Sequence, residues 1–128
     1  MSGRVVHFEI PFDDGDRARR FYKEAFDWQV HEMPGMDYTL VMTGPGGDQG
    51  PTEPGFINGG MLARQMSASK TPVITVDVES IDVALERITE LGGSTLVAKQ
   101  AVGDMGFNAY VRDPEGNVVG LWETAAQG

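Results

Sequence analysis

The spacing of hydrophobic and polar residues predicts a strand, a helix and three further strands in the first half of the chain. Residues 4–10 alternate and are rich in β-branched and aromatic side chains, which is typical of a strand. Asp13 or Asp14 can then cap a helix. Apolar residues recur after them at the spacing of one helix face, namely Ala18, Phe21, Tyr22, Ala25 and Phe26. The basic residues of this helix are expected to point largely to water: Arg17, Arg19, Arg20 and Lys23. Strand-like runs bounded by Pro and Gly follow at 28–33, 38–43 and 56–62.

The second half of the chain shows the same order of elements. Residues 72–78 are strand-like, and Ser80 can cap a helix. The apolar face of that helix consists of Ile81, Ala84, Leu85, Ile88 and Leu91. Gly92 and Gly93 end it where a left-handed residue is favoured. Residues 113–117 (DPEGN) are a strong turn signal. Strand-like runs complete the set at 94–98, 107–111 and 117–122.

The repeated order indicates a duplicated architecture. An offset of 66 residues places Asp16 on Asp82 and Glu24 on Glu90, inside helices that start and stop together. A fixed internal period is the signature of repeated units. We therefore predict an α+β fold of two tandem β-α-β-β-β modules within a single domain, 1–128. Module one covers about 4–62, a small and polar linker about 63–71, and module two about 72–124.

Length, charge and cysteine content limit the classes of function. A chain of 128 residues can bury one sizeable core. Its formal net charge of -9 would repel nucleic acid and anionic lipid surfaces. No apolar run approaches the roughly 18 residues that a membrane span needs. The chain has no Cys, which excludes disulfides, thiolate nucleophiles and zinc-thiolate sites. We expect a cytoplasmic protein with neither a nucleic-acid nor a membrane partner.

The two faces of each module's first strand differ in character. One set of alternate residues is apolar and is expected to pack on the helix: Val6, Phe8 and Ile10, and in the second module Ile74, Val76 and Val78. The complementary set is polar or mixed: His7 and Glu9, and in the second module Val73, Thr75 and Asp77. A curved sheet with helices outside and such an inner face is typical of a binding cup.

Three motifs carry a resemblance to a known family. They are the opening residues 7–11 (HFEIP), the helix residues 16–22 (DRARRFY) and the closing turn at 113–117 (DPEGN). Together they resemble the vicinal-oxygen-chelate superfamily, which includes glyoxalase I, bleomycin-resistance proteins and extradiol dioxygenases, and the similarity covers residues 4 to 124. The resemblance implies that the two modules form a curved sheet cup around a divalent metal, with ligands on the first and last strand of each module.

The metal ligands that the resemblance implies are incomplete in this sequence. His7 matches the first ligand position, 14 residues before the Phe21-Tyr22 pair. The equivalent positions elsewhere are Val73, Gly120 and the stretch 58–60 (NGG), which offer no imidazole or carboxylate. Zinc, nickel or iron sites typically need about three protein ligands. We therefore predict no metal and no other cofactor.

Several residues are candidates for a site inside the cup. His7 is the expected polar centre and a candidate acid or base. The alternative is a half-buried structural His whose ring is hydrogen-bonded to a neighbouring strand. Glu9 and Asn58 are expected to orient a ligand, with Glu9 grouped with His7 as catalytic. Expected lining residues are Val73, Thr75, Tyr110, Gly120 and Trp122, with Trp122 as an aromatic wall or alternatively a dimer contact. Tyr38 is a further candidate hydroxyl, and His31 is expected at the surface.

The predicted function is the binding, with or without transformation, of a small organic molecule in a metal-free cup. One alternative is a metal-dependent lyase or dioxygenase of the glyoxalase type. Another is a non-catalytic protein that sequesters a drug or metabolite. Whether the chain is an enzyme stays open at this point, because one fold hosts many functions. The resemblance also implies a homodimer.

Overall fold

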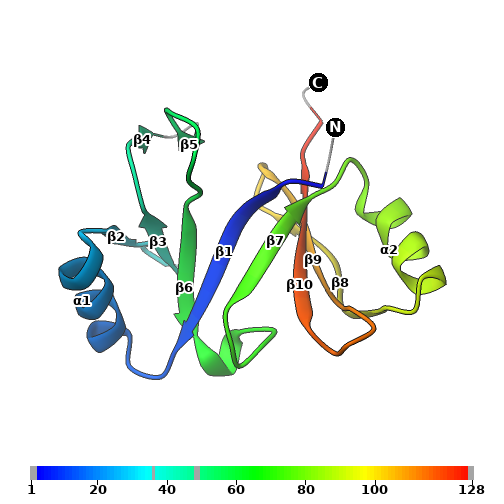
Figure 1. The fold of residues 1–128 in the computed structure, drawn as a ribbon, viewed down its shortest axis with the longest axis horizontal. Helices are drawn as coiled ribbons and strands as arrows, with labels where there is room; N and C mark the ends of the chain where they lie inside the picture. The colour runs from blue at the N-terminus through cyan, green and yellow to red at the C-terminus, as the bar shows by residue number, and fades with distance from the viewer. Residues whose placement is uncertain (1–2, 36, 48–49, 127–128) are drawn as a thin grey trace. The chain divides into compact units, whose positions relative to one another are not determined.

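A computed structural model describes residues 3–35, 37–47 and 50–126 (Figure 1). The chain divides into two compact units. The first unit is His7–Pro72, and the second consists of the residues up to Val6 together with those from Val73 onward. Each unit is described by itself.

The first unit contains one helix and a mixed sheet of strand order β2-β3-β6-β1. Its elements are β1 (Val5–Phe12, whose first two residues belong to the second unit), α1 (Gly15–Phe26), β2 (Gln29–Glu32), β3 (Thr39–Met42), β6 (Gly59–Ala63) and the 3-10 turn η1 (Arg64–Met66). A separate ladder pairs β4 (Gly46–Gly47) with β5 (Gly50–Pro51). Strands β1 and β6 run parallel, and the other neighbours in the main sheet are antiparallel.

The second unit repeats this arrangement. Its elements are β7 (Val73–Asp77), α2 (Ile81–Glu90), β8 (Ser94–Val102), β9 (Gly106–Arg112) and β10 (Val118–Thr124). The strand order is β7-β10-β9-β8, with β7 and β10 parallel and the other pairs antiparallel. Both units therefore place the first strand beside the fourth. The predicted α+β class and the two β-α-β-β-β modules are confirmed.

Local chemistry explains where the helices and turns lie. Asp14 caps α1 by accepting a hydrogen bond from Arg17 N, and Ser80 caps α2 by accepting one from Val83 N. Gly92 has a φ of 98°, which a residue with a Cβ rarely adopts. In the β9–β10 turn, the Asp113 carboxylate accepts hydrogen bonds from the backbone N–H groups of Glu115 and Asn117. The Asn117 side-chain amide also donates to Asp113 Oδ2, and this bond contributes most to holding the pKa of Asp113 below its ordinary value, with the backbone hydrogen bonds adding to it.

The two units pack their helices differently. In the second unit, Ile81, Ala109, Val111 and Leu121 form a buried core, and Val76 and Val78 pack against it as predicted. Ile74 is 49% exposed, so the expectation that it packs on the helix is wrong. In the first unit no residue of α1 is fully buried, and Phe21 and Phe26 are exposed. The Tyr22 ring of α1 stacks on Trp28, with ring centroids 5.2 Å apart.

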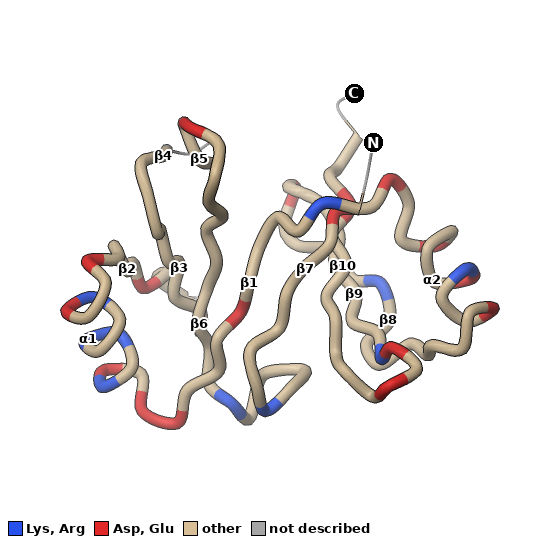
Figure 2. Tube along the Cα trace, viewed as in Figure 1, with Lys and Arg blue, Asp and Glu red and all other residues tan. Residues whose placement is uncertain are grey.

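Charged residues are concentrated on the helices and turns. Figure 2 shows that β3 and β6 carry none. Arg19 departs from the expectation that the basic residues of α1 point to water, because its side chain is only 18% exposed and donates a hydrogen bond to Thr39 Oγ1 at 3.1 Å. Within the described residues, neither helix is long and apolar enough to cross a membrane.

Candidate functional site

His7 and Glu9 lie on the face of the first unit's sheet that points away from α1. Phe8, between them, contacts Trp28, with ring centroids 5.8 Å apart, and Trp28 stacks on Tyr22 of α1. Because successive side chains of a strand point to opposite faces, His7 and Glu9 project from the other face. We call this the open face of the first unit. The predicted division of β1 into a helix-facing set and a polar set therefore holds for these three residues.

The Tyr38 hydroxyl joins His7 to Glu9. Tyr38 immediately precedes β3, and its Oη lies 2.7 Å from His7 Nε2. The same hydroxyl donates a hydrogen bond to Glu9 Oε2 at 3.0 Å. Glu9 is only 8% exposed, whereas His7 and Tyr38 are half-buried. We call these three residues the His7 cluster.

Gly60 makes room for this arrangement. It lies beside Glu9 in the β1–β6 register and opposite Leu40 in the β3–β6 register. A Cβ at Gly60 would collide with the hydroxyl and ring of Tyr38. A glycine inside a strand often marks the close approach of another group, and here that group is the Tyr38 phenol.

The hydrogen bonds fix the proton arrangement of the His7 cluster. Since the Tyr38 hydroxyl gives its proton to Glu9, it can only accept a hydrogen bond from His7, so His7 carries its proton on Nε2. Burial lowers the pKa of His7, and the nearby charge of Glu9 opposes this shift without overcoming it. A neutral His7 protonated on Nε2 keeps a lone pair on Nδ1. Within the described chain, no hydrogen bond to that atom is found.

Asn58 connects two segments of the first unit through its side-chain oxygen. Its Oδ1 accepts a hydrogen bond from Thr43 N at 3.0 Å, just beyond the end of β3. Thr43 Oγ1 in turn donates to the Ile57 carbonyl oxygen at 2.7 Å. The Asn58 side chain thus ties the segment before β6 to the end of β3, and its oxygen is already used.

In the second unit, Thr75, Gly120 and Tyr110 lie together on the face away from α2. Gly120 is in register with Thr75 on one side and Tyr110 on the other. A Cβ at Gly120 would lie 2.8 Å from Thr75 Oγ1 and 3.3 Å from Tyr110 Cε1. The space beside Gly120 is therefore filled by these two side chains. Val73, on the same strand, is only 2% exposed.

Trp122 lies on the same face of the second unit, next to Asn108. The two residues are directly opposite in the β9–β10 register. The Trp122 ring rests on Gly106, where a Cβ would lie 2.7 Å from Cζ2. Its indole N–H donates to Thr124 Oγ1 at 3.1 Å. Trp122 thus presents an aromatic surface whose polar group is already satisfied.

The donor groups do not fit the metal that the fold family implies. Among the residues that the structure describes, no three His, Cys, Asp or Glu side chains lie close enough together to hold a metal ion. His7 and Glu9 share Tyr38 as their partner, while Gly60, Val73 and Gly120 supply no donor. The geometry therefore favours chemistry that uses the side chains of the His7 cluster.

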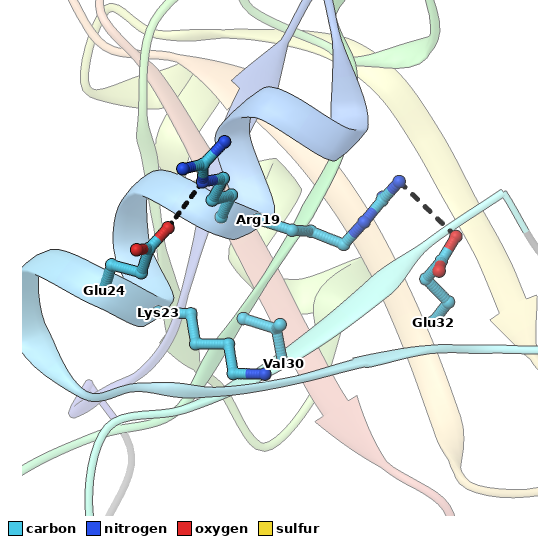
Figure 3. A pocket seen from close by; sticks show the side chains of 6 residues that line it. Arg19, Lys23, Glu24, Val30 and Glu32 are labelled. Atoms are coloured by element: carbon cyan, nitrogen blue, oxygen red, sulfur yellow. Dashed lines mark hydrogen bonds and ion pairs between the residues drawn. The ribbon is translucent and has the colours of Figure 1, made fainter.

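A hollow between α1 and β2 is another candidate place for a ligand in the first unit. Figure 3 shows this hollow, which has a volume of about 440 Å³ and is lined by Arg19, Arg20, Lys23, Glu24, Val30 and Glu32. Its charged groups pair with one another: Arg20 with Glu24 at 2.6 Å and Arg19 with Glu32 at 3.4 Å. The Arg20–Glu24 pair is exposed, as is typical of a solvated helix surface, and the Arg19 guanidinium is already engaged by Glu32 and Thr39. The His7 cluster is the stronger candidate.

Sequence reasoning did not predict the connection that Tyr38 makes or the role of Gly60. Tyr38 was predicted only as a candidate hydroxyl, because its register near the end of a short strand is not fixed by pattern. The signal that could have found Gly60 is the glycine pair inside the strand-like run 56–62. His31 is exposed on β2, as predicted.

Comparisons with known proteins agree with the fold. The profile of the bleomycin resistance protein-like N-terminal family matches residues 4–44. CFP32, named as a candidate glyoxylase in Mycobacterium tuberculosis and Mycobacterium bovis, is 27% identical over 121 residues, which are 90% of this chain. The chain spans 43% of the length of these relatives, which is less than half.

Two solved structures show the same fold. A methylmalonyl-CoA epimerase from Mycobacterium tuberculosis has a TM-score of 0.66 at 15% identity, covering 97% of this chain and 89% of its own. A glyoxalase/bleomycin resistance protein/dioxygenase superfamily member from Vibrio splendidus has a TM-score of 0.63 at 14% identity, covering 95% and 98%. The family profile, the CFP32 relatives and these structures show that the chain is similar to bleomycin resistance protein-like and glyoxalase-like proteins and shares the fold of the glyoxalase/bleomycin resistance protein/dioxygenase superfamily.

Proposed function

We propose that this chain binds a small organic molecule at the open face of the first unit, with the His7 cluster as the polar centre and without a metal ion. The observation that carries the proposal is the Tyr38 hydroxyl bridging His7 Nε2 at 2.7 Å and Glu9 Oε2 at 3.0 Å. This arrangement orients His7 and leaves its Nδ1 lone pair for a ligand. A ligand with a hydroxyl, amide or other N–H group would donate to that atom.

The charge distribution of the sheet supports this proposal. On β1, β3 and β6, the three strands around the cluster, Glu9 is the one charged residue. A nearly buried carboxylate in such a setting is retained only if it is hydrogen-bonded, because desolvation of a charge is costly. Tyr38 supplies one of those hydrogen bonds. Glu9 therefore acts first by orienting Tyr38, and through Tyr38 it orients His7.

Proton transfer is a second candidate function, and the state of His7 favours it. A neutral imidazole with a free lone pair can accept a proton from a bound molecule, and burial keeps His7 neutral by lowering its pKa. The CFP32 relatives are named as candidate glyoxylases. A metal-dependent reaction of the glyoxalase type is the weaker alternative, because three of the four expected ligand positions lack donors. A purely sequestering protein would use the same site for binding alone.

The test is a binding screen that compares matched variants. Saturation-transfer NMR would be run with a library of small hydroxyl-, carboxyl- and amide-bearing compounds against the wild type, His7→Ala and Tyr38→Phe. The controls are His31→Ala, which removes the exposed imidazole, and Tyr22→Phe, which removes a phenol hydroxyl on α1. We expect hits that weaken roughly tenfold or more in the cluster variants and stay unchanged in the controls.

Two results would reject the proposal: no binding by any compound, or hits that the His7 and Tyr38 variants bind as well as the wild type. Hits would then be incubated with the protein to look for conversion. An enzyme loses turnover in His7→Ala with the fold intact, whereas a sequestering protein changes only in affinity.

We further propose that the chain acts in the cytoplasm as a homodimer. Exposed apolar side chains on both helices support self-association: Phe21, Phe26, Val83 and, at the end of α2, Leu91. Light scattering coupled to size-exclusion chromatography tests this, since a mass of one chain at micromolar concentration would contradict it.

A further inference from the structure

Asn108 in the second unit contains a buried acceptor that the protein does not use. Among the described residues, its Oδ1 is the one buried side-chain oxygen or nitrogen without a hydrogen-bond partner. Buried polar atoms are nearly always paired in folded proteins, so an unpaired one calls for a physical explanation. Asn108 was not among the residues that the sequence predicted for the site.

Two glycines near Asn108 leave room for the aromatic rings on either side of it. Gly106, Asn108 and Tyr110 are alternate residues of β9 and share the face away from α2. The Trp122 ring rests on Gly106 on one side of Asn108. On the other side, the Tyr110 ring packs against Gly120. Asn108 therefore lies between two aromatic side chains, and each of these rings packs against a glycine of the paired strand.

This combination has the properties of a recognition point for a flat molecule with a donor group. Aromatic side chains favour flat, apolar partners. The Trp122 N–H already donates a hydrogen bond to Thr124, so a ligand can contact the ring without having to supply an acceptor for it. Asn108 Oδ1 requires an N–H or O–H group. A leucine of similar size would remove the unpaired acceptor, which makes asparagine at this position a cost to folding unless a ligand uses it.

We propose that Asn108 is a specificity-determining residue that accepts a hydrogen bond from a planar aromatic ligand carrying an N–H or O–H group, bracketed by Trp122 and Tyr110. The inference rests on the proposed small-molecule binding and adds a chemical class to it. It concerns residues of the second unit only, so it can fail while the His7 cluster stands.

The first part of the test measures stability without any ligand. Asn108→Leu is compared with Gln100→Leu, because Gln100 is the exposed amide paired with Asn108 on the neighbouring strand β8. We expect Asn108→Leu to raise the Tm by about 3 °C or more, since it removes an unpaired buried acceptor, and Gln100→Leu to leave it nearly unchanged. A lower Tm for Asn108→Leu would show that the oxygen is satisfied in the free protein, for instance by a bound water, and would overturn the proposal.

The second part measures discrimination with two probes of equal shape. Indole carries a ring N–H at the position where benzofuran carries a ring oxygen. Both compounds would be titrated into ¹⁵N-labelled protein. We expect indole to bind the wild type and Gln100→Leu roughly fivefold more tightly than benzofuran. In Asn108→Leu, with an otherwise wild-type amide spectrum, this ratio should fall to about one.

Equal affinities of the two probes for the wild type, or no binding of either, would overturn the role of Asn108. If compounds in the broader screen still depended on His7 and Tyr38, only this inference would be lost. If no compound bound at all, the proposed function would fail with it. The two failures are therefore distinguishable.

Discussion

The two units use the same backbone arrangement to hold different chemistry. In the first, Glu9 lies beside Gly60, and the Tyr38 phenol covers the glycine. In the second, Thr75 lies beside Gly120, and the Tyr110 ring packs against it. Each sheet thus pairs a polar residue on its first strand with a glycine on its last strand and a tyrosine above it.

The two units differ in the residues that their tyrosines, Tyr38 and Tyr110, contact. Tyr38 bridges a histidine and a carboxylate, whereas the positions that correspond to His7 and Glu9 at the 66-residue offset are Val73 and Thr75. The two helices also differ in how deeply they are buried. Helix α2 buries Ile81 completely, whereas α1 buries no residue fully. The comparison teaches that the partly buried histidine–carboxylate pair lies in the unit with the weaker helix packing, while in the other unit the helix packs on a buried apolar cluster.

The largest expected effect concerns that core. Ile81→Ala should lower the free energy of unfolding by about 3 kcal/mol, because it removes a fully buried side chain from the cluster with Ala109 and Leu121. Phe21→Ala on α1, where the side chain is 57% exposed, should cost less than about 1 kcal/mol. Urea unfolding of both variants checks the contrast, and equal losses would contradict the described difference in packing.

The next effect compares the two glycines. Gly60→Ala should lower the free energy of unfolding by about 2 kcal/mol, because the new methyl group collides with the Tyr38 ring. Gly120→Ala should cost less, since its nearest neighbour is the Thr75 hydroxyl at 2.8 Å. In a double-mutant cycle, Tyr38→Ala should cancel much of the Gly60→Ala loss. Additive losses would show that Tyr38 does not lie over Gly60.

A smaller effect is expected from the hydrogen bonds of Tyr38. Tyr38→Phe should lower the free energy of unfolding by about 1 kcal/mol, because it leaves Glu9 and His7 without the shared hydroxyl. Tyr22→Phe is the matched control and should change stability little. The measurement is again urea unfolding at pH 7, and a neutral Tyr38→Phe would contradict the bridging geometry.

The smallest effect is the pH dependence that His7 contributes. The pKa of His7 is lowered in the folded protein, so the unfolded chain binds a proton first as the pH falls through about 6.5. Stability should decrease as the pH falls from there toward the folded pKa and then level off. This loss should be smaller in His7→Gln and unchanged in His31→Gln. A wild-type loss that His7→Gln leaves intact would assign the effect to another group.

The order of the elements could be predicted from the sequence, because it depends on local patterns. The Asp14 and Ser80 caps, the left-handed Gly92 and the turn at Asp113 all follow from short-range chemistry. The helix-facing residues were predicted less well. Ile74 has the periodicity of a buried strand residue but is exposed. Arg19 is charged and yet its side chain is largely buried. The burial of a side chain depends on which residues the neighbouring strands bring against it, and periodicity does not show this.

The candidate site was only partly predictable for a similar reason. The alternation of β1 indicates that His7 and Glu9 share a face, and that is a local property. Their connection through Tyr38 depends on a residue about thirty positions away and on the missing side chain of Gly60. Asn58 was predicted as an orienting group from its position, yet its oxygen binds Thr43 N. Long-range side-chain contacts of this kind are not encoded in periodicity.

The most direct test of the His7 cluster uses the fact that the chain has two histidines. In protein labelled with [¹⁵N]histidine at pH 7, we predict that His7 is neutral and protonated on Nε2, and that the strongest compound of the binding screen shifts its Nδ1 resonance while His31 stays unchanged. A His7 that carries its proton on Nδ1, or a compound that binds without moving either His7 resonance, would contradict the account.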